Sequence, residues 1–169
     1  MHESRLANLL GACGLAVADL TLRNVTGGLN ASSAAAVVVL ASGPVGGTEL
    51  GRQVGLTQSA ATRLVDGLVG EGLAERSSRA GRTVLVSLTA AGRRVAEELL
   101  AARTRTLTSV LTALSADEQE RLGGALEKLL TRLYGDIGSA DLMCRLCDRS
   151  ACTSDAVCPV GQAARDGDR

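Results

Sequence analysis

The sequence predicts a mostly α-helical fold that carries one small β-hairpin. Apolar residues recur at spacings of three and four along most of the chain, which is the period of an amphipathic helix. Two short helical segments are joined by a turn at residues 55–57, and two β-rich segments follow after Gly72. Two short helices followed by a hairpin form a winged helix-turn-helix, and longer helices flank it on both sides.

The composition indicates a globular protein with an aliphatic core. The 169 residues are 46% hydrophobic, and Tyr134 is the only aromatic side chain. The formal net charge is zero, so charge has to be compared segment by segment. Residues 46–94 hold seven arginines against four acidic residues, whereas residues 136–169 hold six aspartates against four arginines. We therefore expect any contact with phosphates in the middle of the chain.

No signal or membrane segment is expected. No continuous apolar run approaches the roughly twenty residues that span a bilayer. Residues 10–13 resemble a lipoprotein cleavage box, but the apolar stretch before them covers only residues 6–10, and Glu3 precedes it. A signal peptide needs a basic start and about 7 to 15 apolar residues. The sequence predicts a cytoplasmic protein.

The N-terminal region, residues 1–45, is predicted to form two supporting helices. The first covers residues 4–23, and its apolar positions are Leu6, Leu9, Leu10, Cys13, Val17 and Leu20. We expect Cys13 to pack there as a small hydrophobic side chain. The second helix covers residues 30–40 and ends in a turn at residues 42–47, which contains Pro44.

Residues 46–95 are predicted to form the winged helix-turn-helix. Thr48 is expected to cap a short helix over residues 49–54, which Gly55 ends. Thr57 caps the next helix, residues 58–71. Its apolar face holds Ala60, Ala61, Leu64 and Leu68, and its polar face holds Ser59, Thr62, Arg63 and Asp66. In this arrangement the second helix enters the major groove of DNA with its N-terminal residues at the base edges.

A hairpin and two long helices complete the predicted order. Residues 73–76 and 83–88 form the strands of the wing, joined by the turn "SSRAGR". Thr89 caps a helix over residues 90–114. Ser115 and Glu118 form a capping box that opens a last helix ending near Tyr134. We assign residues 96–135 to these C-terminal helices.

Residues 48–95, "TELGRQVGLTQSAATRLVDGLVGEGLAERSSRAGRTVLVSLTAAGRRV", resemble the winged-helix core of the MarR family of regulators. With the flanking helices, the resemblance covers about residues 4–134. It implies a homodimer in which the first and last helices are dimerisation helices. It also implies that the two recognition helices bind a palindromic operator in double-stranded DNA.

The resemblance also implies particular DNA contacts. Gln58, Ser59, Thr62 and Arg63 are expected on bases or phosphates of the major groove, and Arg79 and Arg82 on the wing at the minor groove. The wing tip is shorter than is usual in the family, and Arg82, beside the returning strand, is the preferred contact. Many relatives bind aromatic acids, but a chain with one tyrosine gives little support for such a pocket.

The C-terminal tail, residues 136–169, carries four of the five cysteines of the chain. Cys144, Cys147, Cys152 and Cys158 have the spacing C-x2-C-x4-C-x5-C within 15 residues, and the only histidine is His2. Thiolates from such a compact loop can surround one ion or one cluster. The sequence predicts an all-sulfur site in this tail.

Three chemistries fit this cysteine motif. Zinc takes four thiolates in a closed tetrahedron, and an iron–sulfur cluster also takes four, with Pro159 after the last cysteine as in ferredoxin loops. A dithiol switch needs no metal. Because the motif follows the last helix closely, we expect its state to act on the dimer and so on DNA affinity.

The main hypothesis is a sequence-specific DNA-binding regulator, with repression as the expected mode. The alternative is a metal-sensing or redox-sensing protein whose winged helix contacts proteins rather than DNA. An enzyme is not expected, because the sequence offers no nucleophile paired with a base and no paired carboxylates.

Overall fold

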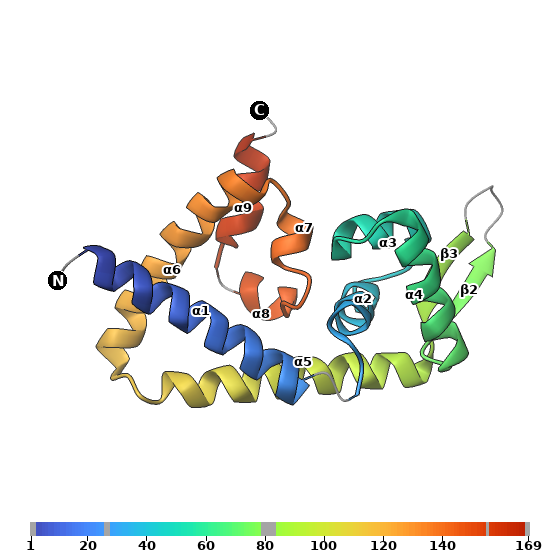
Figure 1. Cartoon of the computed structure of the whole chain (residues 1–169), viewed down its shortest axis with the longest axis horizontal. Helices are drawn as coiled ribbons and strands as arrows, with labels where there is room; N and C mark the ends of the chain where they lie inside the picture. The colour runs from blue at the N-terminus through green and yellow to red at the C-terminus, as the bar shows by residue number, and fades with distance from the viewer. Residues whose placement is uncertain (1–2, 26–27, 79–83, 155, 168–169) are drawn as a thin grey trace.

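The computed structural model describes residues 3–25, 28–78, 84–154 and 156–167 (Figure 1). Its architecture is mostly helical with one small sheet, as the sequence predicts. The elements are, in order, α1 (Glu3–Val25), α2 (Ala31–Ala41), β1 (Val45–Gly46), α3 (Gly47–Val54), α4 (Gln58–Gly70), β2 (Ala74–Ser78), β3 (Val84–Leu88), α5 (Ala90–Leu111), α6 (Ala116–Ile137), α7 (Ala140–Met143), α8 (Arg149–Thr153) and α9 (Pro159–Gly167).

The core is aliphatic and lies in the winged-helix half of the molecule. Seven consecutive residues of α2, 34–40, are buried, so this helix is enclosed on all sides. Leu50 of α3, Leu68 of α4 and Leu88 of β3 are also almost fully buried. The antiparallel sheet has the order β1-β3-β2. Strand β1 falls within the segment predicted as a turn, where Val45 pairs with Val86 of the wing.

The two short helices of the helix-turn-helix pack very closely. A Cβ atom added at Gly51 of α3 would lie 2.6 Å from the Cβ of Ala61 in α4. Gly55 ends α3 with a φ of 76°, and the Thr57 hydroxyl caps α4, as predicted. The predicted cap Thr48 is wrong, because α3 begins two residues earlier than expected and Gly46 is its N-cap.

The start of α5 is fixed against the turn that leads into the wing. The Thr89 hydroxyl donates to the carbonyl of Gly72 at 2.7 Å and accepts from the amide of Gly92 at 3.1 Å. A side chain at Gly92 has no room, since its Cβ would lie 2.0 Å from the carbonyl oxygen of Leu73. The predicted capping box of Ser115 and Glu118 opens α6.

Helix α1 lies along α5 and leaves most of its surface exposed (Figure 1). Cys13 is exposed, so the prediction that it packs in a core is wrong for the single chain. Among the described helices, α1 is also long and apolar enough to cross a membrane: over residues 3–23 the mean hydropathy is 1.3. The expectation from continuous apolar runs missed this, because the polar and charged residues of α1 are interspersed among the apolar ones.

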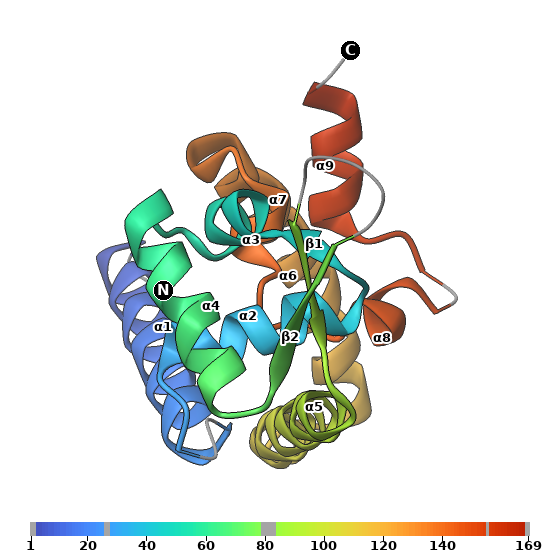
Figure 2. The same ribbon diagram turned by 90° about the vertical axis from the view of Figure 1, so that its right-hand side faces the viewer.

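The C-terminal tail is folded rather than an extended loop. Helix α9 packs on α6, and its Val160 is only 2% exposed. Helix α7 contacts α6, α9 and also α3 of the helix-turn-helix. Figure 2 shows α7 next to α3, on the side of the molecule away from α5. The tail therefore bridges the last long helix and the winged-helix half.

Candidate nucleic-acid interface and four-cysteine pocket

Helix α4 presents the residues that the sequence assigns to the major groove. Its inner face buries Ala61, Val65 and Leu68. The side chains predicted to contact DNA lie on the opposite face and are exposed: Gln58, Ser59, Thr62 and Arg63. The Thr62 hydroxyl donates back to the carbonyl of Gln58 at 3.0 Å, and the guanidinium of Arg63 is exposed at the surface.

A shallow groove of about 490 Å³ runs between α4 and the wing, lined in part by Gln58, Thr62 and Arg76. Arg76 of β2 donates to the carboxylate of Asp66 in α4 at 2.5 Å. This ion pair holds the wing against the recognition helix. Sequence reasoning missed it, because the two residues lie on different elements and only the fold brings them together.

The predicted wing contacts Arg79 and Arg82 lie outside the described residues. The strands on either side of them in the sequence, β2 and β3, are paired in register from Ala74 with Leu88 to Ser78 with Val84. The strand pairing of the wing thus extends over residues 74–78 and 84–88.

Helix α3 carries an ion-pair cluster on its exposed side. Arg52 donates to both carboxylate oxygens of Glu49, at 2.9 and 2.5 Å, and to Asp141 of α7 at 3.0 Å. Hydrogen bonds from Arg52, and then from Gln53, lower the pKa of Glu49 to about 2. The Glu49 carboxylate therefore stays ionised beside Arg52 throughout the physiological range.

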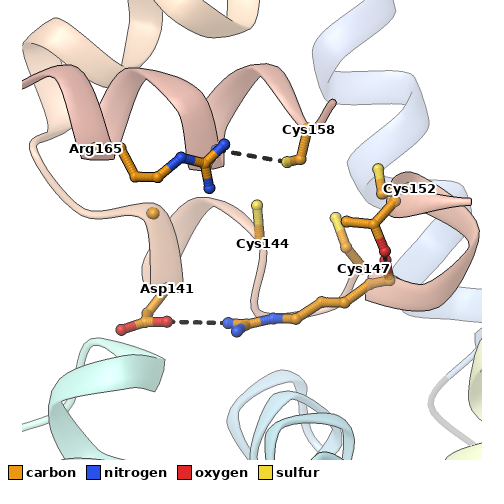
Figure 3. A pocket seen from close by; sticks show the side chains of 10 residues that line it. Asp141, Cys144, Cys147, Cys152, Cys158 and Arg165 are labelled. Carbon is orange, nitrogen blue, oxygen red and sulfur yellow. Dashed lines mark hydrogen bonds and ion pairs between the residues drawn. The ribbon is translucent and has the colours of Figure 1, made fainter. Parts of the chain in front are cut away.

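The four cysteines of the tail line one pocket of about 200 Å³ (Figure 3). Cys144 ends α7, Cys147 lies in the turn before α8, Cys152 is inside α8 and Cys158 precedes α9. The other lining residues include Asp141, Arg149 and Arg165, and in Figure 3 the Arg165 side chain points toward Cys158. The fold thus brings together the four residues that the sequence singled out.

The surroundings of the sulfur atoms affect the individual thiols differently. The amide of Gly161, in the first turn of α9, donates to the sulfur of Cys158 at 3.5 Å. A hydrogen bond from Cys144 and the charges of Arg103, Arg149 and Arg145 lower the pKa of Cys147, against the effect of its burial. The same hydrogen bond, with burial, raises the pKa of Cys144. Burial also raises the pKa of Cys152, so the arginines favour the thiolate, the form that binds metals, at Cys147.

The four cysteines are not gathered into a metal-binding group in this structure. Within the described part of the chain, no three side chains from His, Cys, Asp and Glu converge closely enough to hold one metal ion. Around one zinc, each thiolate sulfur would lie about 2.3 Å from the metal.

Comparison with known proteins gives the family. No protein-family model matches the sequence, and no curated protein matches it. A probable transcriptional regulator from Pseudomonas aeruginosa is 34% identical over 73% of this chain and 96% of its own, with a TM-score of 0.57. The MarR family protein Rv2887 of Mycobacterium tuberculosis is 25% identical over 76% of this chain and 95% of its own, with a TM-score of 0.61.

The chain belongs to the MarR family of transcriptional regulators. The apo form of MarR from E. coli shares the fold, with 23% identity, 77% of this chain and 98% of its own covered, and a TM-score of 0.57. Each of these three structures is covered almost completely, while about a quarter of this MarR-family chain lies outside the match.

The docking of the tail on this MarR-family regulator depends on Val160, and we predict that Val160→Ala loosens it. Shortening a buried aliphatic side chain costs about 1 to 3 kcal/mol, which raises the population of the opened tail by about 5- to 150-fold. Trypsin cleavage after Arg165, followed by mass spectrometry, measures that population when opening is fast relative to cleavage. The matched control is Val157→Ala, since Val157 is 66% exposed. Equal cleavage rates in the two variants would contradict the docking.

Proposed function

We propose that this MarR-family chain is a cytoplasmic, homodimeric repressor that binds a palindromic operator in double-stranded DNA. We propose further that an iron–sulfur cluster held by the four tail cysteines sets its DNA affinity. The observation that carries DNA binding is the exposed polar face of α4 beside a wing that Asp66 and Arg76 hold in place. A bound dimer represses by occupying the DNA that it covers, without a further partner.

The chemistry of the α4 face supports base reading. Arginine donates two hydrogen bonds to guanine, glutamine pairs in the same way with adenine, and Ser or Thr hydroxyls bind either base. The first half of α4 supplies these groups from four side chains: Arg63, Gln58, Ser59 and Thr62. Since the segment 46–94 has a net positive charge, phosphate contacts add to the affinity.

The exposed apolar surface of the long helices supports a homodimer. Nine leucines on α1 and α6 are between 37% and 73% exposed in the single chain: Leu6, Leu9, Leu10, Leu15, Leu20, Leu22, Leu126, Leu129 and Leu133. Soluble monomers rarely expose contiguous apolar patches of this kind, and such patches mark interaction surfaces. A second copy of the chain is the partner that the family resemblance implies. The same partner explains why an apolar α1 need not enter a membrane.

The four-cysteine pocket supports an iron–sulfur cluster. It offers four thiols on short segments, arginines that balance negative charge, and an amide donor to one sulfur. An iron–sulfur cluster is held by four cysteine thiolates, and Pro159 follows the last cysteine as in ferredoxin loops. When bound, such a cluster supplies sensitivity to oxidation. The chain's own residues hold it, balance its charge and limit its contact with solvent.

We predict that Arg63→Ala and Thr62→Ala each weaken operator binding by about 1 to 3 kcal/mol, because each removes a contact to a base. Both side chains are exposed, so the free energy of unfolding should change little. The matched control is Arg132→Ala on α6, whose side chain is 71% exposed and pairs with Asp136. Fluorescence titrations of operator DNA measure the effect. If both α4 substitutions leave the operator affinity unchanged, the assignment of α4 as the recognition helix is wrong.

We predict that Leu126→Glu combined with Leu130→Glu separates the dimer, because two carboxylates would have to be buried in the interface. Light scattering should then report a monomer, while circular dichroism still reports a helical chain. Val84→Glu is the control, since it introduces the same charge at an exposed apolar position of the wing. A variant that remains dimeric at the same concentration would contradict this interface.

We predict that protein purified without oxygen is brown and contains iron and acid-labile sulfide. Cys144→Ser combined with Cys147→Ser should lose both, whereas Cys13→Ser, outside the pocket, should keep them. Absorption spectra and iron, sulfide and zinc analysis per chain test this. A colourless protein with about one zinc per chain and no sulfide would replace the cluster by a structural zinc site. Metal content unchanged in the double variant would rule out the cysteine site.

A further inference from the structure

We propose that Asp141 is a positioning residue that couples the four-cysteine pocket to the helix-turn-helix. This coupling rests on the regulation proposed above, and it is the physical connection by which the cysteine pocket would act on α3. The sequence placed the tail beside the last long helix and predicted an effect through the dimer. The fold adds a direct contact with α3, the helix that supports the recognition helix.

The two carboxylate oxygens of Asp141 bind two different parts of the molecule. Oδ2 accepts from Arg52 of α3 at 3.0 Å, and Oδ1 accepts from Arg149 at 2.9 Å. Arg149 is the first residue of α8 and lines the cysteine pocket. The carboxylate is 28% exposed, which makes it the least exposed partner in this chain of ion pairs. One side chain thus joins the pocket to α3.

Apolar contacts fix the same junction. Gly55 ends α3, and a Cβ atom added there would lie 3.0 Å from the Cδ1 of Leu142, the residue that follows Asp141. Leu146, between Cys144 and Cys147, packs against the hydrophobic core of the winged helix. The segment that carries the first two cysteines is therefore seated on the helix-turn-helix by packing as well as by charge.

A displacement of α3 reaches the recognition helix. Gly51 of α3 and Ala61 of α4 approach so closely that no side chain fits between them. Packed helices of this kind move together rather than deform. The position of α7 on α3 therefore sets the position of α4 relative to the rest of the subunit.

The state of the pocket reaches Asp141 through its neighbours in the chain. Cys144 follows Asp141 by three residues at the end of α7, and Cys147 precedes Arg149 by two. Binding four cysteines to one group cross-links α7 and α8, which stabilises the arrangement in which Asp141 pairs with both Arg52 and Arg149. The loaded tail then restrains α3 in the arrangement that presents α4, which favours DNA binding by pre-organisation.

The test compares operator affinity in the loaded and metal-depleted full-length dimer. For the wild-type chain we expect the loaded form to bind about 5- to 150-fold more tightly, the usual range of coupling between two sites. Asp141→Asn keeps the shape of the side chain and removes its charge. It should reduce this ratio by about fivefold, the upper range for exposed ion pairs. Iron and sulfide content should stay at the wild-type level.

Two further variants make the result specific. Arg52→Gln breaks the same link from α3, outside the pocket, so it should reduce the ratio similarly and remains informative if Asp141→Asn affects loading. Asp136→Asn makes the same charge change in an exposed ion pair of α6 and should leave the ratio unchanged. If Asp141→Asn and Arg52→Gln both keep the wild-type ratio of loaded to metal-depleted operator affinity, the coupling through Asp141 is wrong. If the loaded and metal-depleted wild-type proteins bind operator equally tightly, the proposed regulation is wrong, and so is the coupling through Asp141. Operator binding itself would not be contradicted.

Discussion

The close packing of α3 on α4 is the constraint on which the rest of the structure depends. Gly51 brings the two helices together at Ala61, and the left-handed turn at Gly55 sets the direction in which α4 leaves. Everything attached to α3 therefore acts on the helix that carries Gln58, Ser59, Thr62 and Arg63. Asp66 and Arg76 extend this unit to the wing, so α3, α4 and the hairpin form one presenting surface.

The tail is best understood as part of that unit. Its helices are short, and in isolation segments of four or five residues would not be stable. Three contacts hold them in place. Leu142 of α7 packs beside Gly55 at the end of α3, Leu146 packs on the core, and α9, which contains the buried Val160, packs on α6. A bound group at the four cysteines would add the cross-links that such a small segment otherwise lacks. The same contacts that stabilise the tail couple its position to that of α3.

Local signals in the sequence predicted much of the fold, and long-range contacts account for the rest. The caps at Thr57, Thr89 and Ser115 and the turn at Gly55 are local, and the structure has all four. Strand β1 and the Asp66–Arg76 pair depend on residues distant in sequence, so no local pattern reveals them. The cysteine spacing indicated one site, which the fold assembles in one pocket. The contact of Asp141 with Arg52 spans 89 positions, and only the folded tail brings it about.

Hydrogen–deuterium exchange tests most directly whether the tail restrains the helix-turn-helix. The exchange of α3, residues 47–54, is measured in the full-length dimer with and without its metal. If the tail restrains the helix-turn-helix, the amides of α3 should exchange more slowly in the loaded protein, while those at the start of α5, held by Thr89, should not change. Equal exchange in α3 for the two states, with a difference confined to the tail, would show that the cysteine site does not reach the helix-turn-helix.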